Sequence, residues 1–483
     1  MANDMAPFAG VFFGKSSAPT PAHSGPFEAH QGAPVFSTPE NHTLIVARTR
    51  TGKGTRVIIP TLLRYFMGSA LVIDPKGENA AVTARARMKP MGPAGPGQAV
   101  HIINPWGELA PTFQQLGLPS ATYNPLDILD RDDSNVVSTA QDLAAAICPR
   151  SQMGRDQFWA NSSRDIVSAV LLWLTDQPGE TKTLGRMREI VTRMDFRKAY
   201  LTKMAASSAF GGAIAEFAGP FIPMAEETFS SVMGTLAQYS SFLSDPRIKA
   251  ATAASTFSMR DLPRKMTTVY LVIPPDKMET QRTWLRLLIS AGMQTYKHSG
   301  MKNVRRCMFL IDEFPALGKL EEVSRDISTM AGYGVDFTLA IQGLNQLKDV
   351  YGDAATTIIN NCAYKWFCNL DDLQSAEYLS KTLGNKTVQT KSGSTSMGFN
   401  PGGGSTGSST TLGETGRPLL MPSEILNLGR DTAILLAPGT KPQYLRPIDY
   451  WNLAEAFASL REFYPDLYWG GMPLKWDENP LPH

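Results

Sequence analysis

Eight short apolar runs divide the chain, and turn-forming residues separate them. They cover residues 44–47, 70–73, 100–103, 269–273, 308–311, 337–341, 365–368 and 432–436. Their length and continuous apolarity are typical of strands buried on both faces, as in a parallel sheet wrapped by helices. The pattern predicts the α/β class with a central, mostly parallel sheet.

The apolar spacing changes between the third and fourth runs, from about residue 126 to residue 263. Apolar residues there recur at helical intervals, and strand-like runs are scarce. Two such stripes comprise Val136, Val137, Ala140, Leu143, Ala144 and Ile147, and then Ile166, Val167, Val170, Leu171 and Leu174. We therefore expect an all-α domain at 127–262, inserted into an α/β domain formed by 43–126 and 263–460.

Three further segments lack these patterns. Residues 1–42 are rich in Pro, Gly, Ser and His and predict an irregular lead-in with one short strand at 10–13, and residues 461–483 form a C-terminal tail. Gly, Ser and Thr dominate residues 391–416, which predicts a flexible loop inside the α/β domain. This loop is either a solvated excursion without a role or a segment that orders on a partner.

Composition limits the function classes. A chain of 483 residues with 43% hydrophobic content supports two or three folded domains and excludes disorder as its main state. Lys plus Arg number 46 against 44 for Asp plus Glu, so nucleic acid would have to meet a local basic surface.

Cysteine usage and hydropathy bear on the compartment. The four cysteines lack CxxC spacing and are expected to be core residues in a reducing cytosol; they are Cys148, Cys307, Cys362 and Cys368. The most apolar helical stretch, 166–174, is far shorter than the ~20 residues that span a bilayer. The first residues lack the features of a signal peptide, and the sequence as given predicts a soluble chain.

The sharpest chemical signal is the segment LIVARTRTGKGT at 44–55, where an apolar strand meets a turn and then an amphipathic helix. Such a turn can curl backbone N–H groups around a β-phosphate, while the Lys53 ammonium reaches the β/γ oxygens. The match to the Walker A pattern GxxxxGK[ST] is incomplete, because Ala47 replaces the first Gly and Gly54 the Ser/Thr. Thr55 is the alternative hydroxyl for Mg²⁺, and an ordinary strand–turn–helix junction is the alternative to a phosphate loop. The expected nucleotide contacts are Ala47, Arg48, Thr49, Arg50, Thr51, Gly52, Lys53, Gly54, Thr55 and, after the next apolar run, Asp74.

A second signal follows the run at 308–311, which ends in Asp312 and Glu313. Paired carboxylates at a buried strand end cost several kcal/mol unless a cation compensates them. Beside a phosphate loop, as in a Walker B strand, Asp312 would hold Mg²⁺ and Glu313 would polarise the attacking water.

Other strand ends add polar groups to the same edge of the sheet, where ligands of open parallel sheets bind. Asp74 and Lys76 follow the second run, and Gln342 follows the sixth, where its amide is placed to sense a γ-phosphate. A plain Asp74–Lys76 salt bridge and a structural role for Gln342 remain alternatives.

With these residues assembled, the chain resembles the type IV secretion coupling proteins, the TraG/TraD-type ATPases of conjugation. The matching segments are HTLIVARTRTGKGTRVIIPTLL (42–63), LVIDPKGE (71–78), YNPLD (123–127), FWANSSRDI (158–166), FLIDEFPALGKL (309–320), GYGVDFTLAIQGLNQLKDVYG (332–352) and RPLLMPSEIL (417–426). The GKG form of the loop is similar to this family's own variant.

The resemblance implies a RecA-like P-loop NTPase domain that uses ATP and Mg²⁺, assembled as a homo-hexamer on the cytoplasmic face of the bacterial inner membrane. Its partners would be single-stranded DNA with a relaxase, or protein effectors, and the components of the secretion channel. The all-α domain would be the substrate-docking surface. The family usually begins with two transmembrane helices, so the anchor here was either removed or is naturally absent.

The sequence is also compatible with two other functions. One is a double-strand DNA translocase of the chromosome-partitioning kind, and the other is a substrate-recruiting adaptor without turnover. A neighbouring subunit's arginine is expected to stabilise the transition state, but the sequence does not identify it. Arg282, Arg286 and Arg325 lie on expected helices, and a surface charge is the favoured interpretation of each. Arg305 and Arg306 are candidates for DNA contact or a solvated strand start.

Overall fold

An eleven-stranded sheet forms the centre of the computed structural model, in the order β2-β1-β13-β12-β9-β3-β8-β7-β4-β6-β5. The structure describes residues 10–17, 32–65, 68–88, 97–149, 156–300, 304–400, 403–455, 468–469 and 472–473. The strands are β1 (Phe12–Ser16), β2 (Pro34–Phe36), β3 (His42–Ala47), β4 (Ser69–Asp74), β5 (Ala99–Ile103), β6 (Thr267–Val272), β7 (Cys307–Ile311), β8 (Val335–Ile341), β9 (Cys362–Cys368), β12 (Ala433–Leu436) and β13 (Gln443–Arg446).

All eight predicted runs are strands of this sheet, and seven of them, from β3 to β9, pair in parallel. The eighth run is the exception in this mostly parallel sheet, because β12 pairs antiparallel with β9 and with β13. The continuous apolarity of a run indicates that both faces of the strand are buried, but it does not indicate whether the strand runs parallel or antiparallel to its neighbours. The strand expected at 10–13 is β1, and β2 and β13 complete this antiparallel edge.

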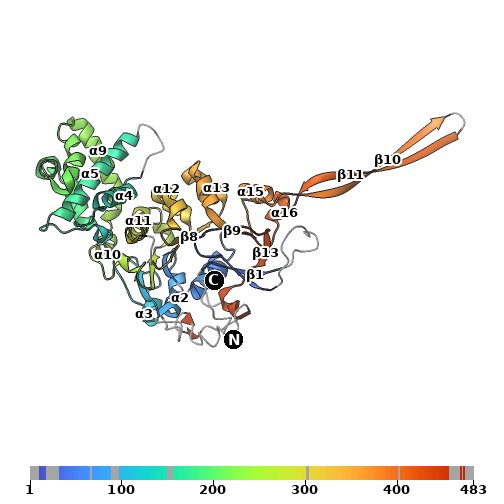
Figure 1. Ribbon diagram of the computed structural model, residues 1–483, viewed down its shortest axis with the longest axis horizontal. Coiled ribbons are helices and arrows are strands. Elements are labelled where there is room, and N and C mark those ends of the chain that lie inside the picture. Colours follow the sequence, from blue (N-terminus) through green and yellow to red (C-terminus); the bar gives the residue numbers. More distant parts are fainter. Residues whose placement is uncertain are drawn as a thin grey trace.

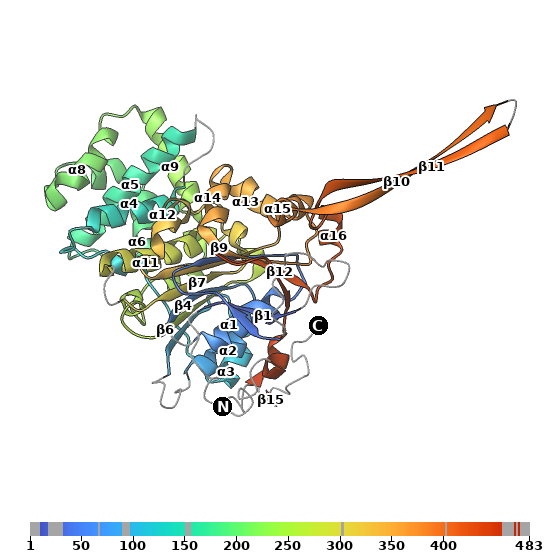
Figure 2. The ribbon, with the colours of Figure 1, turned by 45° about the vertical axis from the view of Figure 1, so that its right-hand side comes forward.

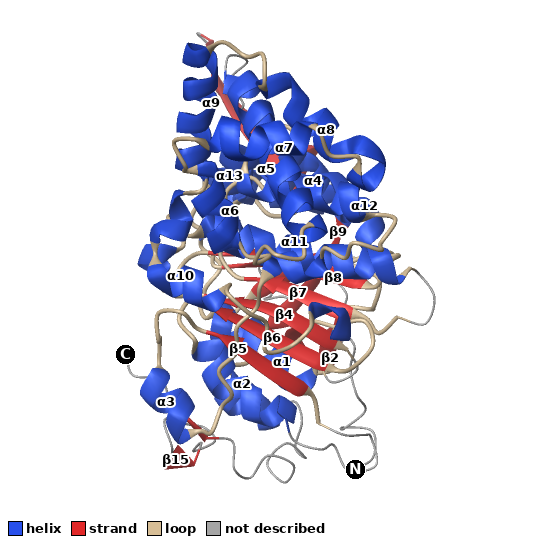
Figure 3. Ribbon diagram, turned by 90° about the vertical axis from the view of Figure 1, so that its left-hand side faces the viewer, coloured by secondary structure: helices blue, strands red, loops and turns tan. Residues whose placement is uncertain are grey.

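Helices cover both faces of the sheet (Figures 2 and 3). Because side chains alternate along a strand, Leu44 and Val46 of β3 enter one hydrophobic cluster, and Ile45 and Ala47 enter the other. One face carries α1 (Ile59–Arg64), α2 (Glu78–Met88) and α3 (Ala110–Gln115). The other carries α11 (Arg282–Ser299), α12 (Glu321–Met330), α13 (Leu344–Tyr351), α14 (Ala354–Asn361) and α15 (Leu373–Leu383).

The expected helical segment lies beside α11, at the far end of the molecule from α15 (Figure 1). It contains α4 (Val136–Ile147), α5 (Asp156–Asp176), α6 (Leu184–Val191), α7 (Thr202–Ala205), α8 (Ala213–Ala218), α9 (Glu226–Tyr239) and α10 (Pro246–Ala251). Both predicted stripes are buried there except Val137, which is half-buried. Its core joins the cluster under α11, so the division into two domains stays a prediction.

The Gly/Ser segment departs from expectation. The segment expected to be a loop at 391–416 lies instead within the antiparallel hairpin of β10 (Asn385–Asn400) and β11 (Gly403–Pro418), and its flexibility stays a prediction. The register is continuous from Asn385 opposite Pro418 to Asn400 opposite Gly403. The hairpin projects far from the body near α15 and α16 (Pro422–Leu426) (Figure 1). Its composition disfavours strands, but pairing over this length satisfies the backbone donors and acceptors internally, which local composition does not reveal.

Two other expectations concern burial. All four cysteines are free and buried, as predicted. Within the described residues, no helix combines the length and the apolarity needed to cross a membrane. The lead-in and the tail lie mostly outside the described residues.

Candidate nucleotide site

The loop after β3 is the local centre of the site. Strand β3 lies between β8 and β9 and ends at Ala47. After the loop, a helix begins with a π-helical turn at Gly54–Ile58 and continues into α1. Arg50 and Gly52 have φ of 63° and 89°, in the left-handed region. The Arg56 N–H donates to the Gly52 carbonyl at 2.8 Å. This geometry turns the chain sharply at the start of a helix, as a phosphate loop requires.

A pocket of about 850 Å³ opens at this loop, at the carboxyl ends of the parallel strands. Among the predicted site residues, its walls include Arg48, Thr49, Arg50, Gly52, Lys53, Gly54, Thr55, Asp74, Asp312, Glu313 and Gln342. Ala47 and Thr51 do not line it: Ala47 is fully buried in the sheet core, and the Thr51 hydroxyl donates to the Arg48 carbonyl at 2.8 Å. These two residues support the loop from the side away from the pocket. Their position in the motif alone does not show whether a residue supports the loop or contacts the ligand.

Lys53, Glu313 and Gln342 meet inside the pocket. The Lys53 ammonium lies 3.1 Å from Glu313 Oε1, and Gln342 Nε2 donates to Glu313 Oε2 at 3.0 Å. Glu313 has a φ of 55°, and its N–H donates to Asp312 Oδ1 at 3.0 Å. Three side chains from distant sequence positions thus form one hydrogen-bonded group: Lys53 from the loop after β3, Glu313 from the end of β7 and Gln342 from the end of β8. Their positions after buried strands predicted this meeting.

The two aspartates of the pocket have raised pKa values. Burial raises the pKa of Asp312 to about 6, although the attraction of Lys53 opposes the shift. Burial raises the pKa of Asp74 to about 7, against hydrogen bonds from the Ala80 and Asn79 N–H groups. A half-buried carboxylate whose charge is poorly solvated is a donor that a divalent metal ion compensates, so Mg²⁺ fits Asp312 in the pocket wall.

Asp74 has a structural contact as well as a place in the pocket wall. Its Oδ2 accepts the Ala80 N–H at 2.8 Å and so holds the first turn of α2. The alternative salt bridge with Lys76 is not among the ion pairs of the described residues, where the Lys76 side chain is exposed.

A polar network behind the loop was not anticipated from the sequence. The Thr55 hydroxyl donates to Asp449 Oδ1 at 2.8 Å, and Arg56 Nε donates to the same oxygen at 3.1 Å. Arg56 Nη2 also donates to Asp431 Oδ1 at 3.0 Å. Asp449 lies 394 residues from Thr55, so no local pattern could reveal the pairing. The Thr55 oxygen keeps its lone pairs while it donates, which leaves it able to accept a cation.

The arginine candidates differ in position. Arg282 lines the pocket of its own chain, whereas Arg286 is buried farther along α11. Arg325 forms ion pairs with Asp142 at 3.2 Å and Asp326 at 2.7 Å. Arg306 pairs with Asp336, which ties the start of β7 to β8 and favours the structural reading for that residue.

Fold and pocket together define an α/β protein of the RecA-like, P-loop class with a helical insertion. The plasmid coupling protein TrwB in complex with a non-hydrolysable ATP analogue has a TM-score of 0.62 and 17% identity, with 92% of this chain and 96% of that chain covered. TrwB in complex with ADP and Mg²⁺ gives a TM-score of 0.61 and 16% identity, with 92% and 96% covered.

The chain belongs to the family described as type IV secretory system conjugative DNA transfer, whose model matches residues 11–465. VirD4 of Agrobacterium fabrum (strain C58 / ATCC 33970) is 30% identical over 439 residues, which are 87% of this chain and 60% of VirD4. The conjugal transfer protein TraG of Escherichia coli is 28% identical over 421 residues, 81% of this chain and 62% of TraG. The chain therefore spans less than two thirds of the length of these curated relatives.

Proposed function

We propose that this chain is a Mg²⁺-dependent ATPase that couples type IV secretion substrates to the channel and moves single-stranded DNA. The observation that carries the proposal is the contact of Lys53 and Gln342 with Glu313, beside Asp312, whose pKa is raised by burial. Family membership supports this coupling function over a chromosome-partitioning translocase.

The proposed roles follow from the geometry of the pocket. Lys53 would exchange its contact with Glu313 for the β- and γ-phosphate oxygens, which frees the Glu313 carboxylate to orient a water molecule. Gln342, released from the same carboxylate, would hydrogen-bond the γ-phosphate or that water. Asp312 and the Thr55 hydroxyl would hold Mg²⁺, which neutralises charge on the β/γ oxygens when bound.

The proposed setting extends beyond one chain. The motor would work as a homo-hexamer on the cytoplasmic face of the inner membrane, with a relaxase–DNA complex or protein effectors docked on the helical segment. An arginine of the neighbouring subunit would complete the transition-state contacts, worth about 10³–10⁵ in rate in nucleotidases that use one.

Hydrolysis of ATP with and without single-stranded DNA tests the proposal. Lys53→Ala should lose nucleotide binding, whereas Glu313→Gln should retain binding and lose turnover by about 10²–10⁴-fold. Lys348→Ala and Glu377→Gln are matched controls, because both side chains are exposed on α13 and α15, away from the pocket. A hexameric wild type that binds ATP and DNA but does not hydrolyse ATP would contradict the motor and favour the adaptor.

A further inference from the structure

A second pocket, of about 480 Å³, lies where the helical segment meets the start of α11. Glu279 and Arg282 line both this pocket and the nucleotide pocket, so the two adjoin. The other lining residues come from just after the end of α4, from α5, α9, the turn after α9 and the first part of α11 with the segment before it; they are Pro149, Trp159, Thr235, Gln238, Tyr239, Ser241, Phe242, Thr280, Thr283 and Arg286.

Arg286 is the unusual member of this lining. Its side chain is only 4% exposed, and its Nη2 donates to the Thr283 hydroxyl at 2.9 Å. Its Nε has no hydrogen-bond partner, and no carboxylate of the described residues forms an ion pair with it. Burial, and then repulsion by Arg282, lower its pKa to about 10. An uncompensated cation at this depth costs free energy that a bound anion would recover.

Another buried arginine shows what compensation looks like in this protein. Arg87 is 1% exposed and donates to the Thr268 hydroxyl, to two main-chain carbonyls and to the Gln98 side chain. The carboxylate of Glu321, whose charge also acts on Arg286, forms an ion pair with Arg164 at 2.9 Å. Arg286 thus makes fewer hydrogen bonds than the similarly buried Arg87, and it lines a cavity.

The remaining lining describes the anion that would fit. Trp159, Tyr239 and Phe242 supply aromatic surface, and the side chains of Thr235, Gln238 and Ser241 supply hydroxyl and amide groups. A guanidinium beside aromatic rings is the combination that binds the phosphate and stacks the base of a nucleotide. The volume is within the range of small-ligand pockets. Glu279, exposed at the boundary with the nucleotide pocket, disfavours a ligand that carries several negative charges.

We propose that this pocket is a second nucleotide site, which takes one nucleotide unit with its single phosphate on Arg286 and its base against Trp159, Tyr239 or Phe242. The unit would come either from a free mononucleotide or from a single strand. The site does not depend on hydrolysis at the first pocket, so failure of one leaves the other testable.

The test measures binding of dTMP and of a labelled (dT)₈ strand to the full chain carrying Lys53→Ala, which removes the lysine of the first pocket. Arg286→Met should weaken binding of the preferred probe about 10–100-fold, and Arg286→Lys should restore part of it. Arg247→Met, an exposed arginine on α10, is the matched control and should bind as the parent does. Tighter binding of dTMP would identify a free nucleotide as the source, and tighter binding of (dT)₈ would identify a strand. Equal affinities of the Arg286→Met variant and its parent would overturn the site.

Two further readouts separate binding from folding. Without ligand, Arg286→Met should melt at or above the temperature of its parent, because it removes an uncompensated buried charge; a lower melting temperature would indicate a structural arginine and contradict the proposal. Quenching of tryptophan fluorescence by the bound probe should disappear in Trp159→Phe while affinity persists. Quenching that survives this substitution would place the ligand elsewhere.

Discussion

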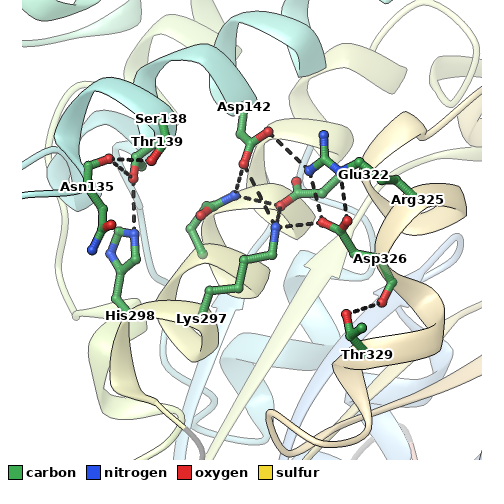
Figure 4. Close-up of polar contacts among 11 residues, drawn as sticks. Asn135, Ser138, Thr139, Asp142, Lys297, His298, Glu322, Arg325, Asp326 and Thr329 are labelled. Carbon is green, nitrogen blue, oxygen red and sulfur yellow. Dashed lines mark hydrogen bonds and ion pairs between the residues drawn. The ribbon is translucent and has the colours of Figure 1, made fainter.

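Two lysines in this protein sit among carboxylates, and their surroundings differ in one respect. Lys53 contacts a single carboxylate, Glu313, in the wall of a large pocket. Lys297 lies among three, with Glu322 and Asp326 each at 2.7 Å and Asp142 at 3.8 Å (Figure 4). The charge of Lys297 is satisfied within the chain, whereas the Lys53 environment retains room and charge for phosphate.

The Lys297 cluster joins three elements. Lys297 belongs to α11, Glu322 and Asp326 to α12, and Asp142 to α4 of the helical segment (Figure 4). Gln294 extends it by donating to Glu322 at 2.6 Å. Burial opposes the charge of Lys297, but Glu322 and Asp326 outweigh this effect and raise its pKa. The cluster therefore locks the helical segment against the helices that cover the sheet, and its role is structural.

The largest expected effect comes from the same substitution at both lysines. Lys297→Met should lower the free energy of unfolding by about 3 kcal/mol, because it leaves the buried Glu322 without a cation among the described residues and leaves Asp142 and Asp326 with only the exposed Arg325. Lys53→Met should change it by less than about 1 kcal/mol, because water reaches the Glu313 side chain, which is 27% exposed. Urea unfolding of the two variants measures the difference. Equal losses would show that Lys53 is as structural as Lys297.

The buried Asp74 in the pocket should make the stability of the protein depend on pH. The pKa of Asp74 is raised by burial from 3.8 to about 7, so between these values the folded state holds a proton that the unfolded state has released. This group therefore lowers stability as the pH rises through that window. The free energy of unfolding of Asp74→Asn, relative to wild type, should increase by roughly 1–3 kcal/mol from pH 5 to pH 8. The exposed Asp353→Asn is the control and should show no trend; a flat difference for Asp74→Asn would contradict the raised pKa.

The smallest expected effect is at the rim of the Lys297 cluster. Arg325 contacts Asp142 and Asp326 there, but its side chain is 55% exposed, and solvent screens both pairs. Arg325→Ala should change the free energy of unfolding by no more than about 1 kcal/mol. Turnover of ATP should be unchanged, because two carboxylates already hold this arginine. A large loss of turnover with intact folding would instead identify Arg325 as the arginine acting in a neighbouring subunit's site.

Much of the site was predictable because its signals are local. An apolar run followed by GKGT, and another followed by two acids, each place polar residues at the end of a buried strand, and parallel strands bring those ends to one edge. Lys53, Glu313 and Gln342 met for this reason. The hydrogen bonds of Thr55 and Arg56 to Asp449 were not predictable, because Asp449 follows β13, an antiparallel strand whose direction apolarity does not encode.

Local sequence patterns were sufficient to predict the α/β class, the eight apolar strands, the helical segment, the burial of the cysteines and the residues that gather at the loop after β3. Each of these depends on periodicity or on a short motif, which neighbouring residues fix. Packing of the whole chain set the direction of β12, the pairing of the Gly/Ser segment into a hairpin and the contrast between Lys53, Lys297 and Arg286. Whether a charge is compensated depends on which distant elements pack together. Burial then increases the free-energy effect of each ion-pair partner that is present or absent.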